Sequence, residues 1–161
     1  MRSVFHLDAM DMHGAYNGPV DGLLAWIRER HKGVLFSQHF IGNMLIEFSS
    51  PTVAVVESYL RTTQRYSATG SQSLAQVLGS SFEGDGRQYD LMSHSRYIDT
   101  VEKRDDRWKV KLRTVVAEIK HVMPVADGKA ARSPGWEFGA RDDTDYIFRV
   151  RRELHIGNQG A

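Results

Sequence analysis

One histidine stands where it could carry out acid–base chemistry. His39 lies within residues 37–43 (Ser-Gln-His-Phe-Ile-Gly-Asn), which open a long apolar run. Imidazole titrates near neutral pH, so a histidine held in a pocket can accept a proton from a substrate. A half-buried strand histidine bonded only to backbone groups fits the same position. The spacing leaves both interpretations open, and the choice between them decides whether this protein is an enzyme or a scaffold.

Polar residues at alternating strand positions extend this candidate site. Ser95, Tyr97 and Asp99 share one face of a predicted strand, and so polar a face indicates either a pocket or contact with solvent. Strand alternation also places Asn43 on the face of His39. The Asn43 amide would then either bind a ligand oxygen or satisfy a neighbouring strand or a bulge.

Arg113 is a further candidate because it lies among apolar residues of another predicted strand. Its guanidinium could contact an anionic or carbonyl group of a ligand. A salt bridge across the hairpin, with Asp99 as one partner, fits the position equally well. The sequence does not choose between these two interpretations.

Composition narrows the class of protein. A chain of 161 residues with 25% charged and 41% apolar residues is typical of one globular domain. The absence of cysteine excludes disulfides, thiolate nucleophiles and cysteine–zinc sites, and it fits a cytoplasmic protein. The formal charge of +1 comes from interleaved acidic and basic residues, so we expect no nucleic-acid partner. No apolar stretch is long enough to span a membrane.

The sequence also argues against resident cofactors. The seven histidines are scattered, and none forms the close pairing with a second ligand that a metal site on one element requires. We find no phosphate-binding loop, dinucleotide fingerprint or nucleophile elbow. We therefore expect neither a metal nor a cofactor.

The elements that must position the candidate residues follow from the pattern of apolar and turn-forming residues. A helix is predicted after Pro19 and runs to about Lys32, where Gly33 ends it. Four long strands are predicted at residues 34–48, 52–66, 89–104 and 107–121. The remaining segments are predicted as a helix tail at residues 1–8, a short strand at 9–13, a long loop at 67–88 and a short apolar return at 145–150.

One helix followed by four long, hairpin-connected strands predicts an α+β domain. Long antiparallel strands twist, so the sheet should curl around the helix into a cone whose open end is a ligand pocket. Residues 1–124 would form this domain, and residues 125–161 would form a C-terminal tail. Residues 1–8 begin without a preceding cap, so we expect the first helix of the fold to be missing or truncated.

Several motifs resemble the SnoaL-like family of the nuclear transport factor 2-like superfamily. They are Ser-Gln-His-Phe-Ile-Gly-Asn at 37–43, Glu57-Ser58-Tyr59, and Arg96-Tyr97-Ile98-Asp99 followed by Arg104-Asp105-Asp106-Arg107-Trp108-Lys109-Val110. Within the superfamily, the chain is similar to scytalone dehydratase and lindane dehydrochlorinase over roughly residues 3–121. This resemblance implies a cone-shaped, cystatin-like α+β barrel with a mostly apolar pocket.

The resemblance also implies roles for single residues. In both enzymes a histidine–aspartate pair removes a proton and a leaving group departs, and His39 matches that histidine. Ser95 and Tyr97 match strand positions that face the pocket. Met12 matches a pocket tyrosine of scytalone dehydratase, and Arg113 matches a pocket-side position of the dehydrochlorinase.

The chain departs from both enzymes at two catalytic positions. Their partner aspartate lies on a first helix that would precede Met1 here, and neither Asp8 nor Asp11 can be assigned its role from proximity in the sequence. Scytalone dehydratase also has a second histidine where this chain has Thr63. The full catalytic set of those enzymes is therefore not present in this sequence.

Two hypotheses follow. The first is a cofactor-independent lyase (dehydratase) or isomerase in which His39 removes a proton from a small, apolar, cyclic substrate. The alternative is a non-catalytic ligand-binding or dimerisation module, like the small subunit of ring-hydroxylating dioxygenases. Under either hypothesis the resemblance implies a homodimer or higher homo-oligomer. Tyr146 and Phe148 of the tail would either close the pocket as a lid or pack against a neighbouring subunit.

Overall fold

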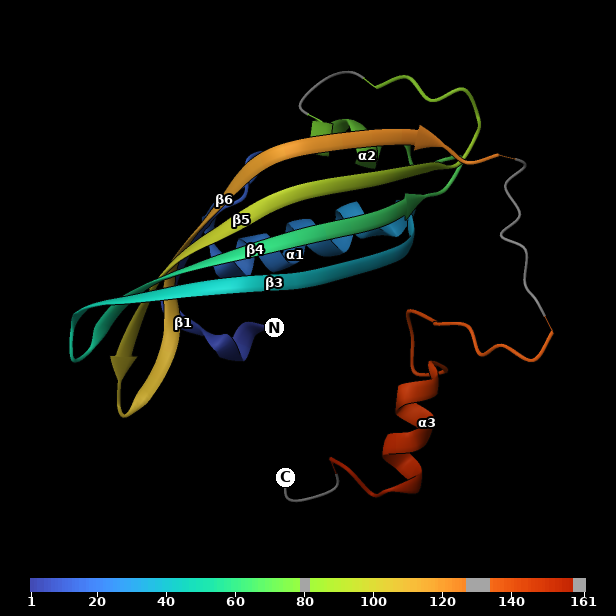
Figure 1. Cartoon of the computed structure of the whole chain (residues 1–161). Coiled ribbons are helices and arrows are strands. Elements are labelled where there is room, and N and C mark those ends of the chain that lie inside the picture. The colour runs from blue at the N-terminus through green and yellow to red at the C-terminus, as the bar shows by residue number, and fades with distance from the viewer. Residues whose placement is uncertain (79–81, 127–133, 158–161) are drawn as a thin grey trace. The chain divides into compact units, whose positions relative to one another are not determined.

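The computed structural model of the protein describes residues 1–78, 82–126 and 134–157. The chain divides into two compact units, Met1–Val125 and Ala126–Ala161. The first unit contains the long sheet, and the described residues of the second contain helix α3 (Tyr146–Glu153) (Figure 1).

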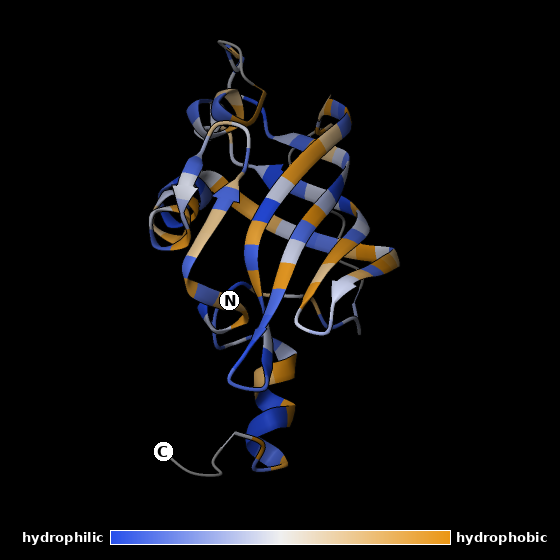
Figure 2. Ribbon diagram, turned by 90° about the vertical axis from the view of Figure 1, so that its left-hand side faces the viewer, coloured by the Kyte–Doolittle hydropathy of each residue, from blue (hydrophilic) through white to orange (hydrophobic). Residues whose placement is uncertain are grey.

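The first unit is an α+β domain, as the sequence predicts. Its sheet has six strands in the order β2-β1-β6-β5-β4-β3, and all neighbours are antiparallel except β1 and β6, which are parallel. The long strands curve, and helix α1 runs along the concave side of the sheet (Figures 1 and 2). The elements are η1 (Arg2–Val4), β1 (Phe5–Met12), β2 (Asn17–Pro19), α1 (Val20–Arg30), η2 (His31–Gly33), β3 (Val34–Ser50), β4 (Val53–Tyr66), α2 (Ser71–Leu78), β5 (Tyr89–Arg104) and β6 (Arg107–Pro124).

Two apolar clusters attach the helices to the sheet. Val20, at the start of α1, packs with Phe5 of β1 in the first cluster. Leu74 of α2 packs with Tyr66 and Leu91 of the long strands in the second. These side chains are almost completely buried, so both helices are held firmly against the strands that carry the candidate residues.

A β-bulge interrupts the alternation of β3 just beyond His39. Ile41 pairs with Leu60, but the next paired residue, Met44, lies opposite Ser58. One extra residue is therefore accommodated at Gly42 and Asn43, and the faces of the strand exchange there. The simple alternation that would place Asn43 on the face of His39 does not continue through this bulge.

Three local predictions were wrong. Only Arg2–Val4 of the predicted helix tail at 1–8 is helical, because residues 5–8 belong to β1, which extends the short strand predicted at 9–13 and pairs with the distant β6. The predicted loop at 67–88 contains helix α2, which buries Leu74 at its centre although Ser and Gln dominate its sequence. Residues 145–150 are not a strand-like return, because residues 146–153 form a helix in the second unit.

That helix, α3 (Tyr146–Glu153), begins at Asp145. The Asp145 carboxylate accepts a hydrogen bond from the Ile147 N–H at 3.1 Å, which satisfies one free donor of the first turn. The Arg149 guanidinium lies 4.3 Å from the centre of the Tyr146 ring. Whether Tyr146 and Phe148 act as a lid stays a prediction.

Within the described parts of the chain, no helix has the length and apolar character needed to cross a membrane.

Candidate active site

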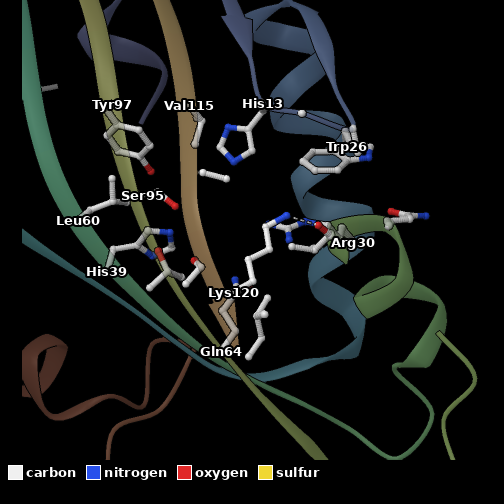
Figure 3. A pocket seen from close by; sticks show the side chains of 18 residues that line it. His13, Trp26, Arg30, His39, Leu60, Gln64, Ser95, Tyr97, Val115 and Lys120 are labelled. Atoms are coloured by element: carbon white, nitrogen blue, oxygen red, sulfur yellow. Dashed lines mark hydrogen bonds between the residues drawn. The ribbon is translucent and has the colours of Figure 1, made fainter. Parts of the chain in front are cut away.

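A cavity of about 130 Å³ lies between the concave face of the sheet and the two helices of the first unit (Figure 3). Its apolar walls include Trp26 of α1, Leu60 of β4 and Val115 of β6. An engineered cavity of about 150 Å³ binds benzene, so the enclosed space suits a single six-membered ring. Some of the sequence-predicted site residues line this cavity and others do not.

His39 lies on the wall of this cavity. It is carried by the edge strand β3 and pairs with Thr62 of β4, which also lines the cavity. Burial, and after it the charges of His13 and Arg30, lowers the pKa of His39 below its ordinary value of 6.5. The ring is therefore neutral at neutral pH and can accept a proton. Among the residues described, none forms a hydrogen bond with the His39 ring.

Ser95 and Tyr97 of β5 lie on the same cavity wall as His39 (Figure 3). Ser95 is buried, and the Tyr97 ring is half-buried. Burial is the largest influence on the Tyr97 phenol and raises its pKa above the ordinary value. The phenol therefore keeps its proton and can donate a hydrogen bond to an oxygen in the cavity.

Asp99, the third residue of that strand face, does not reach the cavity lining. Its carboxylate accepts two hydrogen bonds from Arg113, from Nε at 2.7 Å and from Nη2 at 2.6 Å. The Arg113 guanidinium also lies 4.0 Å from the centre of the Tyr97 ring. Burial opposes the charge on Arg113, but the Asp99 carboxylate outweighs it and raises the pKa of the guanidinium. Arg113 thus takes part in a salt bridge that supports the Tyr97 ring.

Met12 and Asn43 also lie away from the cavity lining. Met12 ends β1 opposite Thr114, and its side chain is exposed. Asn43 is exposed at the bulge of β3. Of the sequence-predicted set, the structure brings together His39, Ser95 and Tyr97, and it leaves Met12, Asn43 and Arg113 outside.

A second imidazole, that of His13, lines the cavity although it was not among the sequence-predicted site residues. His13 follows β1, and its Nδ1 lies 3.1 Å from Oδ1 of Asp11, a residue with no exposed surface. The Trp26 ring stands edge-on to His13, with 6.0 Å between ring centres. The signal was present, because two residues separated by one position project from the same face of an extended strand. An Asp-Met-His sequence therefore predicts such a pair.

Two positively charged side chains line the cavity. Arg30, at the end of α1, and Lys120 of β6 both line the cavity (Figure 3). The Arg30 guanidinium lies 4.8 Å from the centre of the Trp26 ring, and its Nη1 is 3.5 Å from the Tyr66 hydroxyl. Lys120 donates from Nζ to the Val77 carbonyl at 2.6 Å. The described residues contain no cluster of three or more side chains able to hold a metal ion.

Two buried polar atoms lack a hydrogen-bond partner within the described segments. They are Oδ2 of Asp11 and Nε of Arg30. An unsatisfied buried polar atom typically costs about 1–3 kcal/mol, so such atoms concentrate where a ligand or a water completes the site. Both belong to residues at the cavity or directly behind it.

A family model described as a SnoaL-like domain matches residues 1–114, more than two thirds of the chain. The chain belongs to this SnoaL-like family. The match covers β1 to β5 and β6 as far as Thr114, and so it includes most of the residues that line the cavity, while Val115, Ala117 and Lys120 lie beyond it. No curated protein sequence matches this SnoaL-like chain.

Solved structures share the fold of this SnoaL-like protein. One is a protein from Novosphingobium aromaticivorans assigned as a scytalone dehydratase, with 22% identity and a TM-score of 0.55 over 83% of this chain and 77% of that one. Another is the hexachlorocyclohexane dehydrochlorinase LinA-type3 of Novosphingobium barchaimii, with 16% identity and a TM-score of 0.58 over 81% of this chain and 78% of that one. At these identities the similarity shows the fold alone.

Proposed function

We propose that this SnoaL-like protein is a cofactor-independent lyase (dehydratase) or isomerase that acts on a small, largely apolar, cyclic substrate. One observation carries the proposal: a neutral imidazole, a protonated phenol and a hydroxyl, those of His39, Tyr97 and Ser95, share the wall of one ring-sized cavity. A base beside hydrogen-bond donors is the arrangement that proton removal next to a carbonyl requires.

The chemical step uses these groups in turn. His39 takes a proton from the carbon next to a carbonyl, and the electron pair of the broken C–H bond moves to give an enolate. Tyr97 and Ser95 donate hydrogen bonds to the enolate oxygen. In an isomerisation, protonated His39 returns the proton to a different carbon of the same conjugated system, and the enolate electrons reform the carbonyl.

A dehydration needs a proton donor as well as a base. When the enolate expels the β-hydroxyl, the C–O bond breaks and the leaving oxygen must be protonated to depart as water. His13 lines the same cavity, and its Nδ1 lies 3.1 Å from Oδ1 of the Asp11 carboxylate. Protonated His13 supplies this proton. His39 then releases its proton to solvent and His13 takes one up from solvent, so both rings return to their starting states.

The solved structures of the same fold support elimination as the reaction class. Those proteins are named as a dehydratase and a dehydrochlorinase, and both names describe the removal of a proton together with a leaving group. This support concerns the kind of reaction, and it does not extend to the substrates of those proteins.

The test is dehydration of β-hydroxycyclohexanone to cyclohexenone, followed by the ultraviolet absorbance of the enone. A general base typically contributes about 10²–10⁴-fold to the rate, so His39→Ala should lower kcat/KM by that factor. Asn43→Ala, at the neighbouring bulge and away from the cavity, is the matched control and should leave kcat/KM unchanged. Equal turnover by the wild type and His39→Ala would contradict the proposal.

A second candidate is a binding module without chemistry, and one observation favours it. In the described part of the chain no carboxylate hydrogen-bonds to the ring of His39 to fix its tautomer. If the protein is a binding module, His39→Ala changes ligand affinity or stability, and neither protein turns over β-hydroxycyclohexanone or related β-hydroxy ketones.

A further inference from the structure

We propose that Arg30 is an anion-binding residue of the cavity and that the natural ligand is a single-ring compound carrying a carboxylate. The inference rests on the proposed function only in that the substrate occupies the same cavity. It concerns what the cavity binds, and it can be tested without any turnover.

The first support is that Arg30 is buried without a carboxylate partner. Only 9% of its surface is exposed, and within the described residues no acidic group lies within salt-bridge distance of its guanidinium. Its nearest polar partners are the Tyr66 hydroxyl at 3.5 Å and the His31 ring at 3.1 Å. Both are weak acceptors for a cation that cannot lose its proton in a protein.

Arg30 and Arg113 differ in whether a carboxylate pairs with their charge. Arg113, also largely buried, holds the Asp99 carboxylate through two short hydrogen bonds. Arg30 has no such pair, and its Nε has no hydrogen-bond partner at all among the described residues. A buried charge is stable only when it is paired, so a missing counter-ion is expected at Arg30.

The second support is the charge of the cavity as a whole. Its described lining residues include two permanent cations, Arg30 and Lys120, and no Asp or Glu. Lys120 donates to a backbone carbonyl and therefore leaves its charge uncompensated. The acid Asp11 does not line the cavity, and it is bonded to His13, which does. A concave site that is lined by charges of one sign, and whose walls have a low dielectric constant, attracts an ion of the opposite sign.

The third support is the arrangement of the two walls. Arg30 lies on the helical side of the cavity, and His39, Ser95 and Tyr97 lie on the sheet side (Figure 3). A cavity of about 130 Å³ has room for one ring between them. A carboxylate held by Arg30 would therefore direct the far edge of that ring toward the His39 imidazole.

Isothermal titration calorimetry with benzoate and benzamide tests the proposal, because these ligands share a ring and differ in charge. The wild type should bind benzoate at least about tenfold more tightly, since a hydrogen bond between ions is roughly twice as strong as a neutral one. Arg30→Gln should abolish this preference. Arg28→Gln, which removes an exposed arginine of the same helix, should keep it.

Two further proteins keep the test decisive. Lys120→Gln should reduce the preference partly, and it provides a second measurement if Arg30→Gln does not fold by circular dichroism. His39→Asn should still prefer benzoate, so that loss of turnover and loss of anion binding are separated. The proposal is overturned if the wild type binds neither compound, if it binds both equally, or if a folded Arg30→Gln protein still prefers benzoate.

Discussion

At the scale of single residues, the state of His39 determines what the cavity can do. A buried position and two neighbouring positive groups hold the pKa of this imidazole below 6.5. The ring is therefore a base over the whole neutral range, although a weaker one than an unperturbed histidine. The second imidazole, His13, differs because the Asp11 carboxylate lies against it. The cavity therefore holds two imidazoles in different surroundings.

The lowered pKa of His39 predicts how the reaction rate changes at acidic pH. His39 must be neutral to react, so kcat/KM should fall as the pH falls, with a midpoint below 6.5. Replacing His13 by Asn removes a neighbouring positive group, and the midpoint of the His39 titration should then move upward. Nuclear magnetic resonance titration of the His39 ring in both proteins measures this shift directly. An unchanged midpoint would show that His13 does not act on His39 through its charge.

The same pKa makes stability depend on pH. The unfolded chain binds a proton on His39 more readily than the folded chain does, so protonation favours unfolding. The stability contributed by the neutral ring is fully present above pH 6.5 and is lost as the pH falls through and below that value. The drop in Tm between neutral and mildly acidic pH should be smaller in His39→Asn than in the wild type.

At the scale of elements, two cross-strand arginine–aspartate pairs hold the long hairpins in register. Arg113 on β6 binds Asp99 on β5, and Arg65 on β4 binds Asp90 on β5 with the same two-bonded geometry. They differ in burial, because the exposed fraction of the carboxylate side chain is 8% for Asp99 and 24% for Asp90. The contribution of such a pair depends mainly on this difference.

We therefore predict unequal costs for the same substitution. Asp99→Asn leaves the Arg113 guanidinium buried without a charge partner, so the free energy of unfolding should fall by about 3–5 kcal/mol. Asp90→Asn removes a more hydrated pair and should cost about 1 kcal/mol or less. Urea denaturation of both variants gives the comparison. Equal losses would mean that the Arg113–Asp99 pair does not experience a low-dielectric environment.

Some of the elements could be predicted from the sequence, and others could not. The four long strands follow from runs of β-branched and aromatic residues, and the turn between β5 and β6 follows from Asp105 and Asp106, which adopt positive φ angles of 50° and 58°. Helix α2 was missed because it is short and lies within a segment rich in Ser, Gly and Gln, although Leu74, Val77 and Leu78 form its apolar face. Strand β1 was predicted only at its end, as a short strand at 9–13, because its partner β6 lies about a hundred residues away in the chain.

The candidate site was predictable to the same degree. The motif around His39 and the alternation of Ser95 with Tyr97 led to three residues that share one cavity. Asn43 was misplaced because the register shift at Gly42 leaves no reliable local signature. Arg30 was not singled out, since its significance is that no acidic partner lies beside it among the described residues, and partners are visible only in three dimensions.

At the scale of the whole molecule, the outer face of the sheet carries exposed apolar side chains. Phe40 and Leu45 of β3 pair with Arg61 and Glu57, and these positions alternate with those that line the cavity. Phe40 is 61% exposed, Leu45 is 54% exposed and Tyr59 of β4 is 45% exposed. An apolar group of this kind on a sheet face is typical of a protein–protein contact.

The expected homodimer, or higher homo-oligomer, would form through this outer face. Phe40→Lys places a charge in the contact and should convert the assembly to monomers, as measured by light scattering after size-exclusion chromatography. Leu7→Lys replaces a more exposed apolar residue on β1 and should leave the assembly unchanged. A wild-type protein that is monomeric at all concentrations tested would rule out this role for the face.

The central claim is that His39 removes a proton from carbon inside the cavity. Incorporation of deuterium next to the carbonyl of cyclohexanone, in deuterium oxide, tests this step alone, because exchange requires neither a leaving group nor product release. Nuclear magnetic resonance should show exchange catalysed by the wild type and by Asn43→Ala, and only the uncatalysed rate with His39→Asn. Exchange at the wild-type rate in His39→Asn, or none above background in the wild type, would contradict the claim.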